Sequence, residues 1–199
     1  ICMERRSFVR SAGLAGVLAA GAAPAIVHAQ TNLRWRLTSS FPKSLDTLFG
    51  VNDVFAAKVK DLSGGKFQIT THAPGELVPA FEGFDAVRAG TVEMNRANSD
   101  FWTGKTAAAQ YFTAVPFGLN FQGMNGWLYD GGGIDLWNEV YAPFGMVAMP
   151  CGNTGVQMTG WFKKEIKSVA DLKGLKMRIP GLAGRVYAAL GVDVKLLPG

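Results

Sequence analysis

Strand-like and helix-like segments alternate along this chain of 199 residues, and this alternation restricts its fold more than any other feature. Residues 33–38 alternate apolar and polar side chains, which is typical of a β-strand. Apolar residues then recur at helical spacing over 45–62, and Ser63-Gly64-Gly65 ends that helix. Further strands are predicted over 67–71 and 92–97, with a helix over 81–89 between them. This order indicates a parallel sheet with helices packed on it.

The same β-α alternation continues after residue 125. A helix is predicted over 107–112, before that position. After it, helices are predicted over 126–129 and 134–141, and strands over 146–150, 156–162, 175–179 and 192–196. We therefore expect an α/β protein with two lobes, 30–125 and 126–199. A helix usually follows a strand such as 192–196, so we expect the chain to continue past Gly199 and the second lobe to be incomplete here.

The first 29 residues have the pattern of an export signal. Arg5 and Arg6 precede an uncharged run of small and apolar residues over 12–27, and Val27-His28-Ala29 supplies small residues at a cleavage site. The alternative is a membrane anchor, but the run is shorter than the roughly 18 residues of a spanning helix. We interpret 1–29 as a twin-arginine signal peptide, so the mature protein works in the periplasm.

Charge argues against a nucleic-acid partner. The chain has 20 basic and 15 acidic residues, and 17 and 14 remain once the signal peptide is removed. The basic residues are scattered along the sequence. On nucleic-acid-binding surfaces, by contrast, basic residues gather along one face. A mild positive field instead suits anionic solutes.

The sequence contains no recognisable catalytic constellation. Cys151 is the only cysteine after the signal peptide and His72 the only histidine, which disfavours both an internal disulfide and a Cys–His nucleophile. Gly131-Gly132-Gly133 lacks the lysine and hydroxyl residue of a phosphate-binding loop. We therefore predict that the protein is not an enzyme. An exported enzyme stays the alternative, because the twin-arginine route often carries folded, cofactor-loaded proteins.

Two side chains in the second lobe have the chemistry of an anion site. Arg178 lies near the end of a predicted strand that Ile179-Pro180-Gly181 closes, and its guanidinium offers a planar fork that matches a carboxylate. The alternative is a solvated arginine at a sheet edge. The oxygen of Gln157 would suit a hard cation, although a glutamine within a strand is usually just a satisfied polar group.

Three more residues are candidates because ligands of α/β sheets bind beyond the carboxyl ends of the strands. Asn153 could supply an oxygen ligand or simply make a turn. Phe101 and Trp102 follow a predicted strand and could either wall a ligand cleft or pack in the core. Both alternatives stay open at this point.

Long motifs in this chain match a known family. They lie at 35–37 with 39–47, at 75–79 and at 131–136, and most clearly in GNTGVQM at 152–158 and DLKGLKMR at 171–178. From Leu33 to Gly199 the chain resembles the extracytoplasmic solute receptors of TRAP transporters, in the C4-dicarboxylate-binding superfamily. Within that family it is most similar to the receptors for 2-oxo acids such as pyruvate.

The resemblance implies a two-lobed periplasmic-binding-protein fold, similar to type II, that closes over its ligand. It implies that Arg178 clamps the carboxylate of a small monocarboxylate and that Gln157 lies at a bound sodium or calcium ion. The remaining metal ligands of that branch, acidic and aromatic, would lie beyond Gly199. The partners implied are the TRAP membrane permease subunits, and a homodimer is left open.

One segment departs from the family pattern. A tyrosine-rich run is expected near residues 98–102, and this chain has Asn98-Ser99-Asp100-Phe101-Trp102 instead. Loss of phenol donors there could change which acid is preferred. Receptors of the same fold for lactate, dicarboxylates or sugar acids are therefore alternatives, as is a sensor subunit that uses this fold.

Overall fold

The first three strands form one parallel sheet. The computed structural model describes residues 32–198, and the predicted signal peptide lies outside them. Strand β1 (Leu33–Ser39) is central, with β2 (Phe67–His72) on one side and β3 (Met94–Arg96) on the other. Leu37 is in register with Thr71 of β2 and with Met94 of β3, and both pairings are parallel. The predicted parallel sheet is confirmed, although β3 is shorter than expected.

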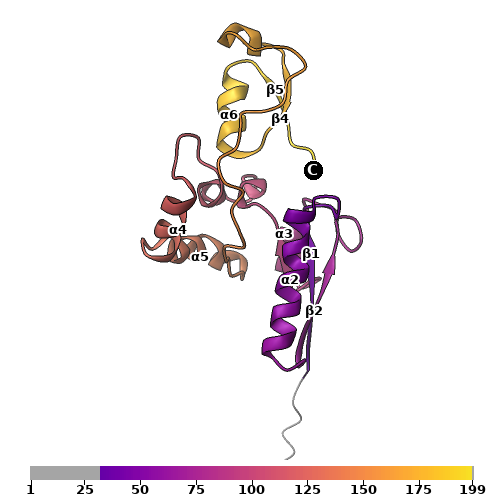
Figure 1. Cartoon of the computed structure of the whole chain (residues 1–199). Helices are drawn as coiled ribbons and strands as arrows, with labels where there is room; N and C mark the ends of the chain where they lie inside the picture. Colours follow the sequence, from indigo (N-terminus) through magenta and orange to yellow (C-terminus); the bar gives the residue numbers. More distant parts are fainter. Residues whose placement is uncertain (1–31, 199) are drawn as a thin grey trace, which may run out of the picture. The chain divides into compact units, whose positions relative to one another are not determined.

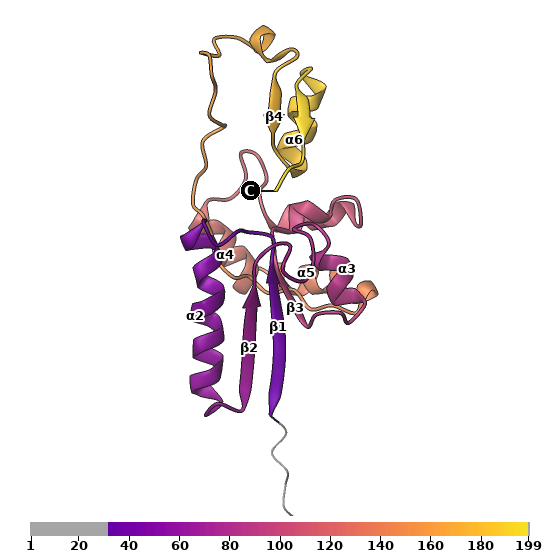
Figure 2. The same ribbon diagram turned by 90° about the vertical axis from the view of Figure 1, so that its right-hand side faces the viewer.

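Helical crossovers connect these strands, as parallel pairing requires. Helix α2 (Asp46–Leu62) runs along the sheet beside β2, and α3 (Gly83–Arg88) leads into β3 (Figures 1 and 2). Phe49 and Asn52 of α2 are buried, whereas Phe55 and Leu62 of the predicted apolar face are 40% and 87% exposed. Helix α2 ends where Gly64 and Gly65 take positive φ values of 59° and 80°, a conformation that glycine adopts without strain.

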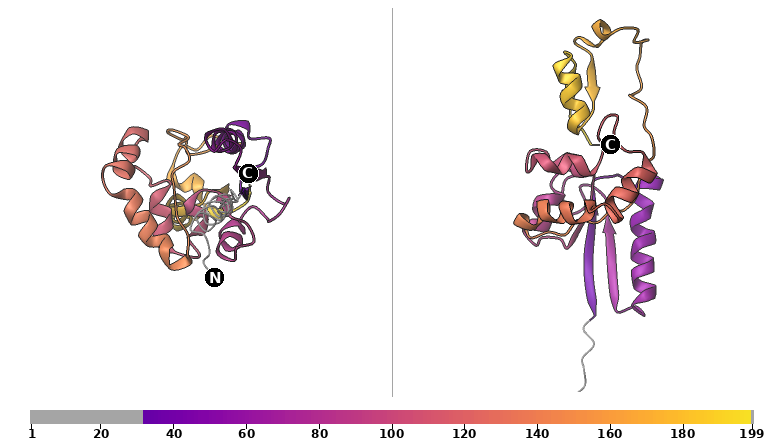
Figure 3. Two further views of the ribbon diagram at one scale, coloured as in Figure 1. Left: turned by 90° about the horizontal axis from the view of Figure 1, so that it is seen from below. Right: turned by 90° about the vertical axis from the view of Figure 1, so that its left-hand side faces the viewer.

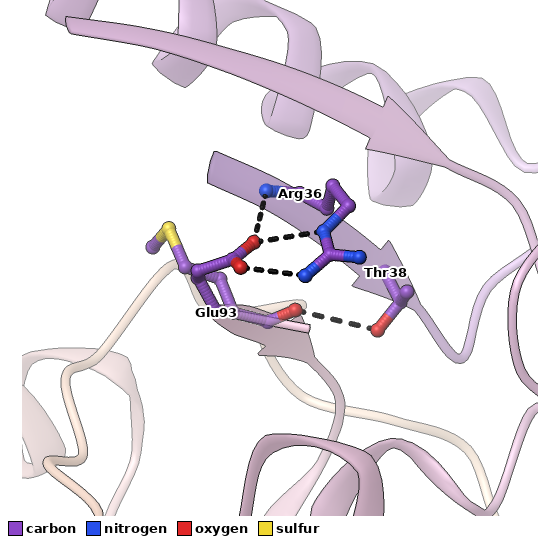
Figure 4. Close-up of polar contacts among 4 residues, drawn as sticks. Arg36, Thr38 and Glu93 are labelled. Carbon is purple, nitrogen blue, oxygen red and sulfur yellow. Dashed lines mark hydrogen bonds and ion pairs between the residues drawn. The ribbon is translucent and has the colours of Figure 1, made fainter. Parts of the chain in front are cut away.

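An ion pair fixes β1 to the residue that precedes β3. The backbone N–H of Arg36 donates to Glu93 Oε2 at 2.7 Å, and its guanidinium binds both oxygens of the same carboxylate (Figure 4). Thr38 Oγ1 donates to the Met94 carbonyl oxygen at 3.3 Å, one step further along the same pair of strands. These contacts set the register of β3, whose carboxyl end leads towards the site described below.

Short helices occupy the middle of the chain. They are η1 (Ser99–Trp102), η2 (Ala107–Phe112), α4 (Phe121–Tyr129), α5 (Gly133–Tyr141) and η3 (Ala142–Phe144) (Figure 3). Helix α4 begins because the Asn120 side chain accepts the Gly123 backbone N–H at 2.9 Å. Gly132 precedes α5 with a φ of 80°. The predicted helices at 126–129 and 134–141 are confirmed, and 107–112 is a 3₁₀ helix.

Aromatic side chains form the main hydrophobic core. Phe84, Phe101, Trp102 and Tyr141 are all buried and pack together with Phe41. Tyr141 comes from α5, so this core includes residues from both sides of the lobe boundary that the sequence predicts at residue 125. The boundary itself stays a prediction.

A second parallel pair follows a 3₁₀ turn, η4 (Val169–Leu172). Strand β4 (Lys176–Arg178) pairs with β5 (Asp193–Lys195), and α6 (Gly181–Ala189) makes the crossover between them (Figure 1). The capping box of Ser168 and Asp171 starts η4. The strands predicted at 175–179 and 192–196 are confirmed, each with shorter bounds.

Two predicted strands are wrong. Residues 146–150 and 156–162 do not form strands, despite their apolar composition. A strand exists through hydrogen bonds to a neighbouring strand, and neither segment has one among residues 32–198. The Ala148 N–H donates instead to Asn138 Oδ1 at 2.8 Å. Within the same described residues, no helix is long and apolar enough to span a bilayer.

Candidate functional site

The turn η1 presents three consecutive side chains just past the carboxyl end of β3. Phe101 and Trp102 are 8% and 5% exposed, so the core alternative considered for this pair is supported. Phe101 packs edge-to-face on Phe81, with ring centroids 5.2 Å apart, and Trp102 lies against Phe84. Burial of these two rings holds the backbone of η1, and therefore the neighbouring Asp100, in one position.

Arg178 lies at the carboxyl end of β4 and reaches the Phe101 ring. Its guanidinium carbon is 5.9 Å from the centre of that ring, within the range of a cation–π contact. Its Nε donates to the Leu197 carbonyl oxygen at 2.9 Å. Among residues 32–198, the two terminal nitrogens of the guanidinium have no hydrogen-bond partner, and the side chain is exposed. The fork that matches a carboxylate is therefore accessible.

Asp100 is a candidate site residue that the sequence does not predict. It is only 4% exposed, and its Oδ1 has no hydrogen-bond partner in the described part of the chain. Burial raises the pKa of this carboxyl to about 6, while a hydrogen bond with the backbone of Asp100 itself and, to a smaller extent, the charge of Arg178 lower it. One sequence feature could have identified Asp100. It is a charged residue that lies between Ser99 and Phe101, shortly after a strand, where the chain enters the core.

Helix α6 begins against the Asp100 side chain. Gly181, its first residue, has a φ of 64°, and a Cβ placed there would lie 3.0 Å from Asp100 Cβ and 3.2 Å from Oδ2. Only glycine allows this close approach. The start of α6 also carries the positive end of a helix dipole, which favours a negative charge nearby. Asp100, Arg178 and Gly181 therefore converge at one place.

Gln157 and Asn153 lie in an exposed loop rather than in a strand. Gln157 Nε2 donates to Thr154 Oγ1 at 2.7 Å, so its side-chain oxygen is left for another partner. Asn153 Oδ1 accepts the Gly155 N–H at 2.7 Å and so makes a turn. A turn was one of the two alternatives for Asn153, the other being an oxygen ligand. The loop passes beside β4, because a Cβ on Gly160 would lie 3.1 Å from Met177 Cε.

The fit to a cation rests on the amide oxygen of Gln157. Oxygen ligands are the ones that sodium and calcium prefer. No group of three His, Cys, Asp or Glu side chains is placed to hold a metal within residues 32–198. Gln157 could therefore supply one ligand of a hard-cation site, and the described residues provide no acidic cluster around it.

The chain matches one protein family over most of its length. The family model described as bacterial extracellular solute-binding protein, family 7, matches residues 38–199. A curated relative from Nostoc sp., named as a monocarboxylate 2-oxoacid-binding periplasmic protein, is 54% identical over 168 residues. That match covers 84% of this chain and 46% of the relative.

Solved structures have the same fold. A TRAP periplasmic solute binding protein from Pseudoalteromonas atlantica, with bound sodium and pyruvate, is 40% identical with a TM-score of 0.82, over 84% of this chain and 51% of that one. A TRAP transporter solute binding protein from Bordetella bronchiseptica, with copurified calcium and picolinate, is 46% identical with a TM-score of 0.82, over 84% and 50%. The predicted fold is confirmed, and the chain spans about half the length of these relatives.

Proposed function

Since this chain belongs to family 7 of the bacterial extracellular solute-binding proteins, we propose that it binds a small 2-oxo acid such as pyruvate. It would do so in the periplasm, as the receptor of a TRAP transporter. The relative from Nostoc sp. is named for 2-oxo acids, and the relative from Pseudoalteromonas atlantica holds pyruvate. The same family match supports the resemblance drawn from the motifs at 152–158 and 171–178.

The observation that carries the proposal is the position of Arg178. Its guanidinium stands at the carboxyl end of β4, exposed and unpaired at both terminal nitrogens among the described residues, with the Phe101 ring beside it. Two parallel N–H donors would bind the two oxygens of a carboxylate. The contact with the ring restricts the guanidinium, so less side-chain freedom is lost when the ligand binds.

A sodium or calcium ion fits this function. Relatives of this chain were crystallised with bound sodium or calcium. When bound, such an ion would offset part of the negative charge of the acid and accept its oxygens as ligands. Gln157 would hold the ion through its side-chain oxygen, and its own hydrogen bond to Thr154 would orient the amide for this role.

The remaining assignments follow from this function. Residues 1–29 would direct export by the twin-arginine route, and the receptor would pass its ligand to the membrane permease subunits of the transporter. Phe101 and Trp102, which are buried in the core, would form the wall of the site where it borders the core. A homodimer is a further proposal. We also propose that the protein is not an enzyme, because the relatives described above are solute-binding proteins.

Calorimetry on the full-length mature protein tests this function. Pyruvate and longer 2-oxo acids are titrated with and without sodium or calcium. One-to-one binding with a micromolar Kd or tighter is expected, and Arg178→Lys should weaken it by a hundredfold or more, about 3 kcal/mol, because lysine lacks the fork. Arg185→Lys on the exposed face of α6 is the matched control and should bind normally. No heat with any 2-oxo acid would overturn the proposal.

A further inference from the structure

We propose that Asp100 is a ligand-positioning residue that is protonated when the receptor is occupied and donates a hydrogen bond to the ligand, so that binding the anion takes up one proton. The proton comes from bulk water, and no covalent bond changes. This inference rests on the function proposed above, and it identifies a second recognition group beside Arg178.

The carboxyl group of Asp100 is buried, and one of its oxygens lacks a hydrogen-bond donor in the described part of the chain. Asp100 is 4% exposed, and neither the core rings around it nor the turn that carries it supplies a donor to Oδ1 among residues 32–198. Its other oxygen lies against the first residue of α6, where only the absence of a side chain on Gly181 makes room. A buried polar atom without a partner costs free energy, so Oδ1 is available to a partner that arrives with the ligand.

One guanidinium and one phenol of the described residues influence the charge of Asp100. The charged and titratable groups that the described residues bring to Asp100 are Arg178 on β4 and Tyr141 on α5. Tyr141 donates its hydroxyl to Ser99 Oγ at 3.1 Å, and burial raises the pKa of its phenol, so it stays neutral. Arg178 is thus the positive charge that stabilises an ionised Asp100, in addition to the larger effect of the hydrogen bond with the Asp100 backbone.

A ligand carboxylate on Arg178 removes that support. The arginine charge would then be shared with a second anion, and two carboxylates that share one buried site cannot both stay ionised. The pKa of Asp100 is already raised to about 6 by burial, so a further rise carries it through neutrality. A protonated Asp100 can donate a hydrogen bond to the 2-oxo oxygen, which is an acceptor only.

The same chemistry gives a preference among acids. An ionised Asp100 would favour a ligand with an ammonium group beside its carboxylate, such as a 2-amino acid. A protonated Asp100 favours a ligand whose second group only accepts hydrogen bonds, such as a 2-oxo acid. The two states therefore select different ligands at different pH values.

Calorimetry of the full-length protein with pyruvate, from about pH 5 to pH 8, tests the inference. At each pH, buffers with different ionisation enthalpies report the protons taken up on binding. We expect uptake approaching one proton near pH 7, and a Kd that rises up to about tenfold per pH unit on the alkaline side. Asp100→Asn, which keeps a donor without titrating, should bind pyruvate with no proton uptake. Asp135→Asn, an exposed control on α5, should retain it.

The outcomes separate this inference from the proposed function. Tight pyruvate binding with no proton uptake in the native protein, or with unchanged uptake in Asp100→Asn, overturns the role of Asp100 and leaves the receptor function standing. No heat with pyruvate at any pH overturns both. If Asp100→Asn does not fold, as judged by near-UV circular dichroism, the proton uptake of the native protein decides the question alone.

Discussion

Arg36 binds the carboxylate of Glu93 with three donors. Its backbone N–H and its Nε reach Oε2 at 2.7 and 3.1 Å, and its Nη2 reaches Oε1 at 2.6 Å (Figure 4). These hydrogen bonds hold the pKa of Glu93 at about 2, well below its ordinary range. Since Glu93 directly precedes β3, the pair connects the central strand to the segment that leads into η1.

This pair predicts an acid-sensitive contribution to stability. Because the folded pKa is depressed, the contribution is complete above the unfolded value of 4.5 and is lost as the pH falls towards 2. Glu93→Gln should therefore lower the urea midpoint at pH 7 and reduce the dependence of stability on pH below about 4.5. Glu165→Gln, in an exposed pair with Lys167, makes the same charge change and should alter neither. Parallel pH profiles for native protein and Glu93→Gln would contradict this account.

Asp100 predicts the opposite pH dependence. Its pKa is raised from an ordinary 3.8 to about 6, so its contribution to stability is complete below 3.8 and is lost as the pH rises through 6. In the absence of ligand, Asp100→Asn should stabilise the protein at pH 7 by up to about 3 kcal/mol, and the gain should vanish below about pH 4. Urea unfolding at both pH values measures it. Asp61→Asn, at an exposed position on α2, is the control, and an equal gain there would sink the prediction.

A side chain at Gly181 is predicted to destabilise the protein more than a side chain at Gly64. Gly181 and Gly64 have similar φ values of 64° and 59°, but an added Cβ meets Asp100 only at Gly181, and nothing lies within 4 Å at Gly64. Gly64→Ala should cost about 1 kcal/mol for the backbone conformation alone. Gly181→Ala should cost at least about 1 kcal/mol more and should weaken pyruvate binding. Equal unfolding free energies for the two variants would show that α6 does not press on Asp100.

The stacked rings at Phe112 are predicted to stabilise the middle of the chain. Phe112 is 8% exposed and lies parallel to Trp127 and Trp137, with ring centroids 5.7 and 5.3 Å away. Phe112→Ala should lower the free energy of unfolding by about 3–5 kcal/mol. Phe117→Ala removes a fully exposed ring and should change it by less than about 0.5 kcal/mol. Differential scanning calorimetry compares the two, and similar melting temperatures would contradict the assignment.

Gln157 is predicted to control the cation dependence of binding. Gln157→Ala should abolish the improvement in pyruvate affinity that sodium or calcium gives, and should weaken binding in their presence by about tenfold. The loop keeps its Asn153 turn, so folding should be unchanged. Gln122→Ala on the exposed face of α4 should leave the cation dependence intact. Retention of the cation effect in Gln157→Ala would remove this residue from the metal site.

The sequence predicts most of the fold because its strongest patterns are local. The helical spacing of α2 and the alternation in β1 each identify an element without reference to the rest of the chain. The strand predictions at 146–150 and 156–162 are wrong because they depend on distant residues. An apolar run becomes a strand only beside another strand. Composition cannot show whether that neighbour is present.

The candidate site likewise contains residues that local sequence can predict and residues that depend on contacts between distant parts of the chain. Arg178 could be chosen from its strand end, and its contact with Phe101 brings together two residues that the sequence selected separately. Asp100 could not be chosen, because its meaning depends on burial and on the approach of Gly181, eighty-one positions later in the chain. Periodicity carries no information about such a contact. All five residues that the sequence selects stay predictions as site residues: Arg178, Gln157, Asn153, Phe101 and Trp102.

One four-residue turn, η1, carries both the two rings that pack in the core and the buried acid whose pKa the charge of Arg178 lowers. Substitutions at this turn therefore affect both folding, through the two core rings, and ligand selectivity, through the acid. In a library randomised over positions 99–102, most variants would be lost to misfolding before selectivity could be measured, and the survivors would differ mainly at position 100. New ligand preferences in this protein should thus arise by exchange of one residue within a fixed aromatic frame.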